Sequence, residues 1–248
     1  MIHFTYDDLI LVTGASSGLG AESCVLLNSL GARVIGVGRN AKNLAETKDR
    51  CPHPENFFPE YRDLVDDIDT ITTWVRTLVQ HYGKLVGLLC CAGIGNLLPA
   101  AMQTDAEIRR IFDLNFFALF QVARGFLDRR NNQGRGSSIV FLASSSYERD
   151  NAGLSAYASS KGAVISLMRS LACEYLKQGI RVNSISPGFI LTPMTKATYT
   201  DAEAIANTYP LGPGQPSDVA KTAIFLLSSC SRWLTGQNIV LDGGRGLL

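Results

Sequence analysis

Short apolar runs alternate along the chain with longer segments in which apolar residues recur at helical spacing. Seven such runs predict strands, at Leu9–Val12, Arg33–Val37, Phe57–Tyr61, Leu85–Cys91, Ser138–Leu142, Arg181–Ile185 and Asn238–Leu241. Between them the periodicity predicts helices near residues 18–30, 42–50, 68–82, 105–130, 155–178 and 217–229. Strands that alternate with helices in this way favour a parallel sheet with helices on both faces.

No linker, repeat or low-complexity segment divides the chain, so the pattern predicts one domain over residues 1–248. Because crossovers between parallel strands are right-handed, we expect a doubly wound α/β fold of about seven parallel strands. The segment 187–216 holds no predicted strand and is rich in Thr, Ala and Pro. We interpret it as an excursion that covers the functional site.

The composition, with 46% hydrophobic and 18% charged residues, is typical of a globular protein. The net charge of +1 and the lack of a basic stripe with interleaved aromatic residues argue against a nucleic-acid partner. Residues 85–104 are uncharged, but glycines and Pro99 interrupt them, so they read as a strand running into a loop and not as a membrane span. Asp7 and Asp8 break the N-terminal region early, and no signal peptide is predicted.

The six cysteines form no Cys-x-x-Cys pair, and the chain has three histidines. Neither a metal site nor a disulfide framework is indicated. Reduced thiols in a cytoplasmic protein are the expectation that follows.

Tyr157 and Lys161 stand four residues apart in a predicted helix, so their side chains share one face. A phenol has a pKa near ~10, and bringing that pKa close to neutral needs about 4 kcal/mol of preferential phenolate stabilisation. An ammonium about 4 Å away supplies an energy of that order at an effective dielectric of ~20. Ser144, thirteen residues upstream of Tyr157, offers a hydroxyl to hold a substrate oxygen. The set suits proton transfer at an alcohol or carbonyl oxygen, although Tyr and Lys at this spacing are also ordinary surface neighbours.

A glycine-rich turn follows the first predicted strand. It reads Thr13-Gly14-Ala15-Ser16-Ser17-Gly18-Leu19-Gly20 and opens the first predicted helix. Glycines allow a tight turn and a close backbone approach to a pyrophosphate, and the helix N-terminus favours the negative charge. Three residues separate the first two glycines here, unlike the common Gly-x-Gly-x-x-Gly spacing, and a purely structural turn is the alternative.

About twenty residues after the turn, an acidic residue would be expected to bind the ribose of NAD. This chain instead has Gly38-Arg39, which places a guanidinium where a 2′-phosphate would lie. We therefore predict NADP(H) over NAD(H), with Ser16 as a second candidate phosphate contact. A solvated loop arginine is the alternative interpretation of Arg39. Asp63 offers an acceptor for the adenine amino group, or a cap for the next helix.

Together these motifs resemble the short-chain dehydrogenase/reductase family of the compact cytosolic type, over nearly the whole chain from Leu9 to Gly244. The resemblance implies a Rossmann-type domain and a catalytic set of Ser144, Tyr157, Lys161 and Asn115. It also implies cofactor contacts at Thr13, Gly14, Ser16, Ser17, Gly18, Leu19, Gly20, Arg39, Asp63, Leu64, Cys91, Ala92, Gly93, Tyr157, Lys161, Pro187, Gly188, Ile190 and Thr192. Such enzymes are commonly homotetramers or dimers, with the tail 234–244 near a subunit interface, so the resemblance implies an oligomer. Asn115 is expected to connect to Lys161 through a water.

One position departs from the family. Its usual Asn-Asn-Ala-Gly reads Cys90-Cys91-Ala92-Gly93 in this chain, which removes an amide that braces the sheet. We expect a modest loss of rigidity and interpret the two cysteines as buried structural thiols.

The resemblance implies reversible hydride transfer between NADP(H) and a carbonyl/alcohol pair, with Tyr157 as proton donor and Ser144 polarising the oxygen. A general ketone or a 3-oxoacyl group on an acyl carrier protein is the first substrate expectation; sugar, polyol, steroid and other secondary-metabolite carbonyls stay open. Arg129, Arg130 and Arg135 offer a basic landing site for an acidic carrier, whereas Gln178 replaces a residue that is basic in many such reductases.

Residues 145–154, 93–98 and 189–209 are expected to form the substrate walls. Their apolar members are Phe189, Met194 and Tyr199, and their polar members are Tyr147, Glu148 and Asn151. A nucleotide-responsive binding or regulatory protein on the same scaffold is the alternative function. Loss of the tyrosine or the lysine would favour that alternative, and both residues are present.

Overall fold

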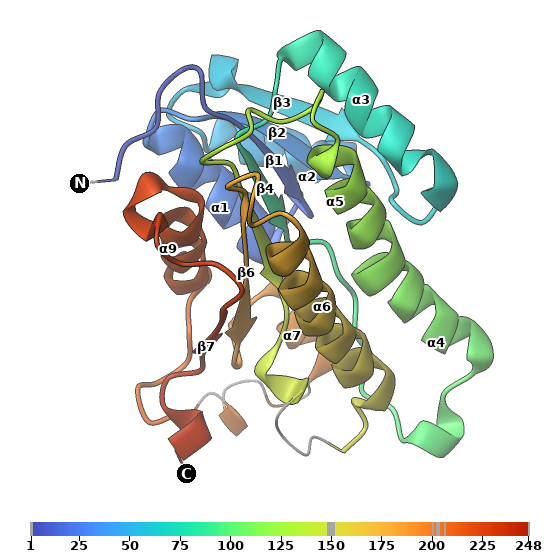
Figure 1. Cartoon of the computed structure of the whole chain (residues 1–248). Helices are drawn as coiled ribbons and strands as arrows, with labels where there is room; N and C mark the ends of the chain where they lie inside the picture. The colour runs from blue at the N-terminus through green and yellow to red at the C-terminus, as the bar shows by residue number, and fades with distance from the viewer. Residues whose placement is uncertain (1, 148–151, 200, 202–203, 206, 248) are drawn as a thin grey trace.

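The computed structural model describes residues 2–147, 152–199, 201, 204–205 and 207–247. Its centre is one seven-stranded sheet in the order β3-β2-β1-β4-β5-β6-β7, and every neighbouring pair is parallel. The strands are β1 (Leu9–Thr13), β2 (Arg33–Gly38), β3 (Phe57–Tyr61), β4 (Gly87–Cys90), β5 (Ser138–Leu142), β6 (Arg181–Pro187) and β7 (Asn238–Leu241). The expected doubly wound fold is confirmed (Figure 1).

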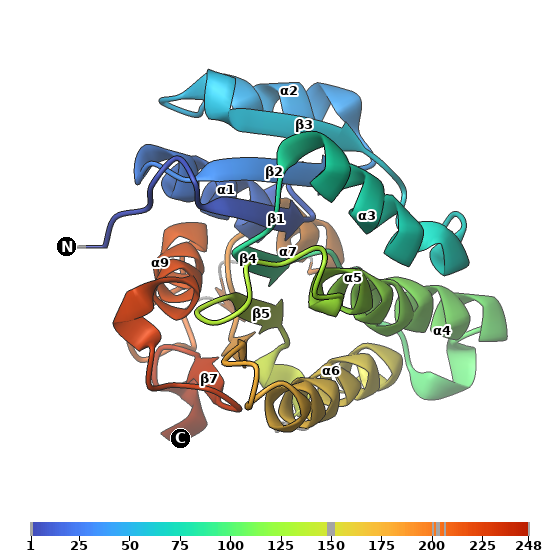
Figure 2. The same ribbon diagram turned by 45° about the horizontal axis from the view of Figure 1, so that its top comes forward.

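Helices cover both faces of the sheet. They are α1 (Gly18–Ser29), α2 (Ala41–Asp49), α3 (Ile71–Tyr82), α4 (Asp105–Phe112), α5 (Leu119–Leu127), α6 (Ser155–Glu174), α7 (Pro193–Thr198) and α9 (Pro216–Leu227). Figure 2 shows α1 and α9 on one side of the sheet and α3, α5 and α6 on the other. No helix in the described part of the chain is long and apolar enough to cross a membrane.

The alternation of side chains along each strand divides the core between these two layers. In β1, Leu9 and Leu11 pack into the cluster that holds α3, α5 and α6, whereas Ile10 and Val12 pack into the cluster that holds α1 and α9. All four side chains are buried, as expected for a parallel strand covered on both sides.

The order of the strands fixes where a ligand can bind. The chain passes from β1 outward to β2 and β3, and then returns to the other side of β1 to form β4. The connections that leave the carboxyl ends of β1 and β4, after the paired residues Thr13 and Cys90, therefore run in opposite directions along the sheet. In open α/β sheets, ligands bind in the crevice at this switch point.

The structure differs from the expected elements in two places that matter for the site. The helix expected over residues 105–130 is α4, a π-helical segment (Asp113–Ala118) and α5 in sequence. The excursion holds the short helix α7, which begins after Thr192, a residue that caps it through the Thr195 amide. An isolated bridge between Ile190 and Gly214 closes the described part of that excursion.

Candidate active site

The turn between β1 and α1 forms a floor in which backbone atoms lie so close together that two of its glycine positions have no room for a side chain. Gly14 has φ +71°, and a Cβ added there would lie 2.8 Å from the Ala92 nitrogen. A Cβ at Gly20 would collide with the Gly14 carbonyl oxygen. The Thr13 hydroxyl accepts a hydrogen bond from the Ala92 amide at 3.1 Å and so joins the ends of β1 and β4. These glycines are therefore required by contacts and conformation, as a cradle for a phosphate group demands.

A long cleft of about 270 Å³ runs over this floor at the carboxyl ends of the strands. The expected cofactor contacts that line it are Gly14, Ser16, Ser17, Gly18, Leu19, Gly20, Arg39, Asp63, Leu64, Cys91, Ala92, Gly93, Tyr157, Lys161, Pro187, Gly188, Ile190 and Thr192. Thr13 does not line the cleft, because it is buried beneath the floor. Segments that are distant in the sequence therefore line one groove.

Two guanidinium groups lie at the β2–β3 end of the cleft. Arg39 is half-exposed, and its Nη1 lies 3.8 Å from Oδ2 of Asp63. Arg62 also lines the cleft, although the sequence interpretation missed it. The Arg62 guanidinium donates to the Thr70 hydroxyl at 2.7 Å and lies 4.9 Å from the centre of the Trp74 ring. The sequence signal that points to Arg62 is its position immediately before Asp63, a predicted cofactor contact.

Ser144, Tyr157 and Lys161 converge at the other end of the same cleft. Tyr157 lies in the first turn of α6, and Lys161 lies one turn later. Lys161 is 4% exposed, and its Nζ donates to the Leu142 carbonyl at 2.9 Å. That Nζ lies 5.8 Å from the centre of the Tyr157 ring. The helix therefore places both groups beside Ser144, which follows the end of β5.

The pKa of Tyr157 moves opposite to the expectation. Burial raises this pKa above its usual value, a hydrogen bond with Ser144 lowers it, and the neighbouring Tyr199 raises it. Burial lowers the pKa of Lys161 to about 8, against smaller raising effects of Cys91 and Cys90. The expectation that Lys161 gives Tyr157 a pKa below its usual value is therefore wrong for the protein without cofactor or substrate. Ser144 is the group whose hydrogen bond favours the phenolate.

Asn115 lies behind the cleft, in the π-helical segment, and is fully buried. Its Oδ1 accepts from the Ile94 amide, and its Nδ2 donates to the Ile94 carbonyl, each at 2.9 Å. Its Nδ2 also lies 3.0 Å from the Ser160 hydroxyl oxygen. A Cβ added at Gly93 would lie 3.2 Å from the Lys161 Nζ and 3.3 Å from the Asn115 Oδ1. The amide thus fixes the loop after β4 and lies near Lys161, through Ser160 and across Gly93.

A second pocket of about 370 Å³ adjoins the cleft. Both are lined by Ser144, Tyr157, Gly188, Met194 and Thr195. The rest of the pocket's lining is Gly95, Ser145, Ser146, Leu154, Phe189, Thr198, Tyr199, Ile205, Thr208, Tyr209 and Arg245. The hydroxyls of Ser144 and Tyr157 therefore stand where the two cavities meet.

This lining agrees only in part with the expected substrate walls. The Tyr147 hydroxyl accepts a hydrogen bond from Asn238 of β7 at 3.0 Å, and Tyr147 is not among the pocket's lining residues, which corrects its expected place. Glu148 and Asn151 lie outside the described residues. Arg245 was missed, because it comes from the C-terminal end of the chain, far in sequence from the rest of the pocket.

The two adjacent cysteines behave as buried thiols. Burial raises the pKa of Cys91 to about 12 and raises that of Cys90 well above its usual value. A thiol with so high a pKa carries almost no thiolate at neutral pH. Cys91 lines the cleft as a small polarisable side chain where the resembling family has an amide.

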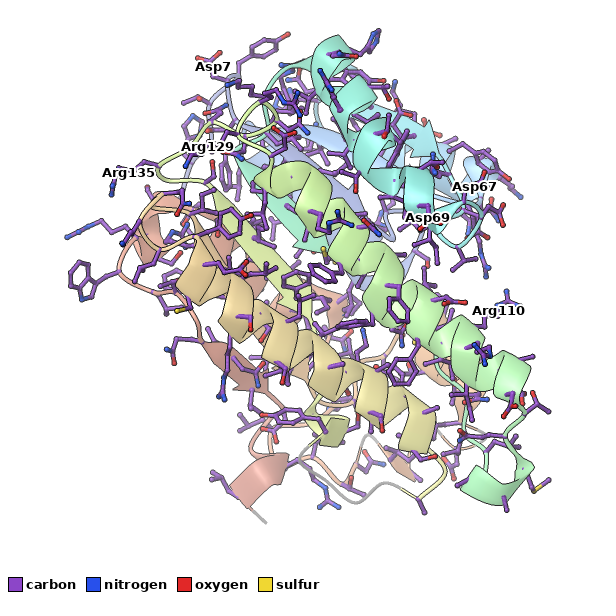
Figure 3. The ribbon with its side chains drawn as sticks, turned by 45° about the vertical axis from the view of Figure 1, so that its right-hand side comes forward. Asp7, Asp67, Asp69, Arg110, Arg129 and Arg135 are labelled. Carbon is purple, nitrogen blue, oxygen red and sulfur yellow. The ribbon has the colours of Figure 1, made fainter. Side chains whose placement is uncertain are left out.

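The basic trio expected to receive an acidic carrier lies at the opposite end of the sheet. Arg129, Arg130 and Arg135 lie between α5 and the first residue of β5, whereas the cleft lies beyond the last residues of the strands. The Arg135 side chain reaches Gly179, which lies beyond the C-terminal end of α6. Tyr157 lies in the first turn of the same helix, at its opposite end. A 20-residue helix is about 30 Å long. Figure 3 shows Arg129 and Arg135 near that far end.

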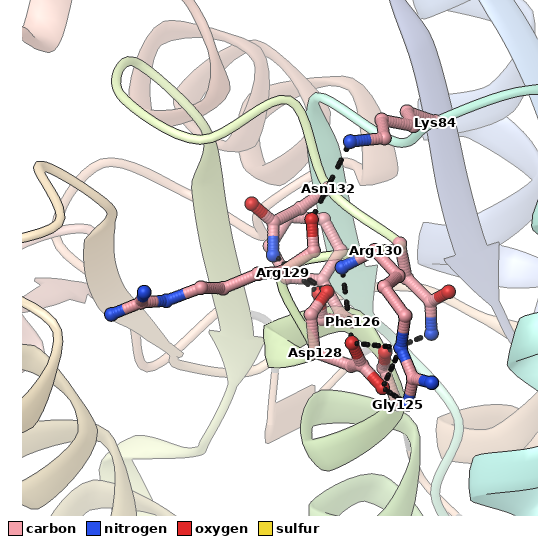
Figure 4. Close-up of polar contacts among 8 residues, drawn as sticks. Lys84, Gly125, Phe126, Asp128, Arg129, Arg130 and Asn132 are labelled. Atoms are coloured by element: carbon pink, nitrogen blue, oxygen red, sulfur yellow. Dashed lines mark hydrogen bonds and ion pairs between the residues drawn. The ribbon is translucent and has the colours of Figure 1, made fainter.

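The arginines also differ in their contacts. Arg130 Nε donates to Oδ1 of Asp128 at 3.0 Å, and this ion pair lowers the pKa of Asp128 to about 2. Lys84 donates to the Arg129 carbonyl at 3.5 Å. Figure 4 shows the Arg129 side chain pointing away from the pair formed by Arg130 and Asp128. Within one chain, this surface does not continue into the cleft.

Comparison with known proteins shows similarity over nearly the full length. Residues 14–245 match the family model described as Enoyl-(Acyl carrier protein) reductase. A 3-oxoacyl-[acyl-carrier-protein] reductase FabG from Rickettsia conorii is 34% identical over 236 residues, covering 94% of this chain and 95% of the relative. A 7alpha-hydroxysteroid dehydrogenase from Escherichia coli K12 is 30% identical over 237 residues, covering 94% and 92%.

A solved structure shares the fold. A protein from Brucella melitensis described as short-chain dehydrogenase/reductase SDR:Glucose/ribitol dehydrogenase superimposes with a TM-score of 0.90 at 29% identity. The superposition covers 99% of each chain.

Proposed function

The chain belongs to the short-chain dehydrogenase/reductase family of oxidoreductases, and on that premise we propose that it is an NADP(H)-dependent reductase of ketones or 3-oxoacyl groups. The observation that carries the proposal is the junction of the two cavities. A dinucleotide would lie along the glycine-floored cleft and a small substrate in the adjoining pocket, and Ser144 and Tyr157 line both.

When bound, the nicotinamide cofactor supplies or accepts the hydride. We propose that in the reductive direction Tyr157 gives its phenolic proton to the substrate oxygen while Ser144 donates a hydrogen bond to the same oxygen. The raised pKa of Tyr157 keeps the phenol protonated, as a proton donor must be. Ser144 has a single hydroxyl proton, so its hydrogen bond with Tyr157 is exchanged for the one to the substrate oxygen when the substrate binds.

Lys161 and Asn115 have supporting roles in this proposal. Lys161, held by the Leu142 carbonyl, faces the cleft where the nicotinamide ribose would be held. With a pKa lowered to about 8, its ammonium exchanges protons near neutral pH and can return one to the phenol. Asn115 holds the loop at Ile94 in place, and so shapes the wall of the cleft beside the proton path from Lys161 to Tyr157.

NADP(H) preference is the second part of the proposal. Arg39 puts a half-exposed guanidinium at the end of the cleft where the adenosine would lie. Arg62 lines the same end with its guanidinium hydrogen-bonded to Thr70, and Ser16 lies there beside Gly38. A 2′-phosphate there would gain charge-assisted hydrogen bonds in place of the long Arg39–Asp63 contact. Arg39→Ala should weaken NADPH binding by about 10- to 100-fold and NADH binding by less than about threefold.

Titration of both cofactors against intrinsic fluorescence measures this preference. Lys42→Ala, at an exposed lysine of the neighbouring α2, is the matched control and should change neither affinity. Tighter NADH than NADPH binding by the wild-type protein would remove the case for Arg39 as a phosphate ligand.

The substrate class is supported by the relatives. They carry names for the reduction of 3-oxoacyl groups and for the oxidation of a hydroxysteroid, both reactions of a carbonyl/alcohol pair. We propose a ketone or 3-oxoacyl substrate, covered by the segment 187–216, in a cytoplasmic homo-oligomer.

A screen of NADPH oxidation against diverse ketones, aldehydes and acyl thioesters tests the activity. On any substrate found, Tyr157→Phe should lower kcat by about 10²- to 10⁴-fold and leave NADPH affinity within about threefold. Tyr175→Phe, just beyond the other end of α6, serves as the control. Unchanged turnover in Tyr157→Phe would contradict the assignment. NADPH binding with no oxidation across the panel would instead favour a nucleotide-responsive regulatory protein.

A further inference from the structure

The pocket beside the cleft contains a cation that the proposed reaction does not use. Arg245 lines this pocket together with hydroxyl groups and with the aromatic side chains of Phe189, Tyr199 and Tyr209. Among the lining residues that the structure describes, it is the only Arg, Lys, Asp or Glu. A positive charge therefore faces the cavity in which the substrate would lie.

The turn that carries Arg245 is fixed by backbone geometry and by one carboxylate. Gly243 and Gly244 have φ of 56° and 78°, and these values let the chain double back after β7. The Asp242 carboxylate accepts hydrogen bonds from the Gly244 amide at 3.2 Å and the Gly246 amide at 2.7 Å. The Gly243 carbonyl also accepts from Leu211, which joins the turn to the excursion. Arg245 therefore extends from an anchored turn.

Among the described residues, its guanidinium has little local compensation. Its Nη1 donates to the Thr208 carbonyl at 3.5 Å, which is long for a hydrogen bond. No carboxylate of the described residues lies within 4.0 Å of it. The carboxylate of Asp242, three residues before it, accepts hydrogen bonds from two backbone amides of the same turn. A guanidinium beside aromatic walls attracts carboxylate and phosphate groups, which it can bind through two parallel hydrogen bonds.

We propose that Arg245 binds an anionic group of the substrate, so that the preferred substrates are oxo compounds with a carboxylate or phosphate a few bonds from the carbonyl. This inference rests on the proposed function and narrows its substrate class. The reacting carbonyl would lie at Ser144 and Tyr157, and the anionic end would lie toward the C-terminal turn. Neutral ketones and neutral acyl thioesters would be poorer substrates.

Matched pairs of ketones test the proposal. The probes are 4-oxopentanoate with its methyl ester, and dihydroxyacetone phosphate with dihydroxyacetone; a neutral 3-oxoacyl thioester of N-acetylcysteamine completes the set. We expect the wild-type protein to favour at least one anionic probe over its neutral partner by about tenfold or more in kcat/KM. A comparison of the acid pair with the phosphate pair shows whether the protein prefers a carboxylate or a phosphate on the substrate.

Variants at position 245 locate the effect. Arg245→Met should lower kcat/KM for the preferred anionic probe by about 10- to 100-fold, mainly through KM, and change the neutral partner by less than threefold. Arg245→Lys should retain part of the preference, because it keeps the charge and loses the planar fork. Arg232→Met, at an exposed arginine outside both cavities, is the control. Equal losses on anionic and neutral probes, or a wild-type preference for the neutral member of both pairs, would overturn the proposal.

Binding measured without turnover separates this inference from the proposed function. Calorimetric titration of 4-oxopentanoate and of dihydroxyacetone phosphate should show binding to the wild-type protein that weakens about tenfold or more in Arg245→Met. If no ketone is reduced, the proposed function fails, and this titration still decides the role of Arg245. Equal binding by wild type and variant, or no binding of either anion by the wild-type protein, would refute that role. Far-ultraviolet circular dichroism verifies that each variant is folded.

Discussion

Lys161 is a charged side chain in a place from which water is almost excluded. It is 4% exposed and has one hydrogen bond to a protein carbonyl. Burial lowers its pKa from 10.5 to about 8, so the folded protein holds its proton less strongly than the unfolded chain does. Between these two values the unfolded state binds more protons, and the free energy of unfolding therefore rises with pH across that range.

The cost of the buried ammonium is fully present below pH 8 and disappears as the pH approaches 10.5. The interval between the two pKa values corresponds to about 3 kcal/mol. A residue that served only the fold would be replaced by an apolar side chain at this position. The charge is understandable if the group is needed for the reaction.

Lys161→Met should therefore remove a pH-dependent penalty. We expect the difference in free energy of unfolding, variant minus wild type, to fall by about 2 to 3 kcal/mol between pH 7 and pH 10. The absolute difference at pH 7 is smaller than the full penalty, because the Leu142 carbonyl loses its partner. Urea denaturation at several pH values measures both quantities.

Lys196→Met, at an exposed lysine of α7, is the control and should show no such trend. A difference that stays constant from pH 7 to pH 10 would mean that Lys161 keeps an ordinary pKa in the folded protein. Loss of NADPH oxidation in the same variant would accompany the proposed catalytic role.

At the scale of elements, the alternation of apolar strands and amphipathic helices was sufficient to predict the sheet. The bounds of β3, β5 and β7 agree with the predicted strands. Of these, β5 is a fully buried apolar run, whereas β3 and β7 are edge strands with partly exposed residues. The α7 helix was missed, although Thr192 before Pro193 is a capping signal at a helix start. A six-residue helix has too little periodicity to be recognised by pattern.

The helix predicted over 105–130 illustrates what periodicity cannot give. The π-helical segment within it holds Asn115, whose amide makes its hydrogen bonds to Ile94 and Ser160, residues of the loop after β4 and of α6. These partners are distant in sequence, so only tertiary structure brings them to the amide. π-Helical turns inside α-helices occur frequently at functional sites.

The residues of the candidate site also fall into those that a local motif predicts and those that only the tertiary structure reveals. The glycine turn and the Tyr157–Lys161 pair are local motifs whose geometry follows from one strand, one turn or one helix. Arg245 reaches its pocket from the C-terminal end of the chain, and no local pattern identifies it. Arg62 lines the cleft beside Asp63, and that adjacency is its only sequence signal. The direction of the Tyr157 pKa could not be predicted either, because it depends on how deeply its neighbours bury the phenol.

At the scale of the whole molecule, the two edges of the sheet differ in chemistry. The edge strand β3 contains Pro59 and Glu60, which oppose the addition of another strand. The edge strand β7 reads Asn-Ile-Val-Leu, and Val240 in it is 40% exposed. An apolar edge of this kind favours contact with a second protein surface, and we propose that β7 lies at the interface of a homo-oligomer.

A charge on each edge tests this proposal. Val240→Lys should convert the wild-type oligomer to a smaller species, because a lysine buried at an interface loses its hydration without gaining a partner. Tyr61→Lys, at a 69% exposed side chain of β3, places the same charge on the opposite edge and should leave the assembly unchanged. Light scattering coupled to size-exclusion chromatography, at micromolar protein concentration, measures both masses. A monomeric wild-type protein, or an equal effect of the two substitutions, would exclude β7 as the assembling edge. Asn238 of β7 donates to the Tyr147 hydroxyl, and Ser145, two residues before Tyr147, lines the pocket proposed for the substrate. Dissociation at this edge should therefore also loosen that wall of the pocket. We expect it to raise KM more than it lowers kcat.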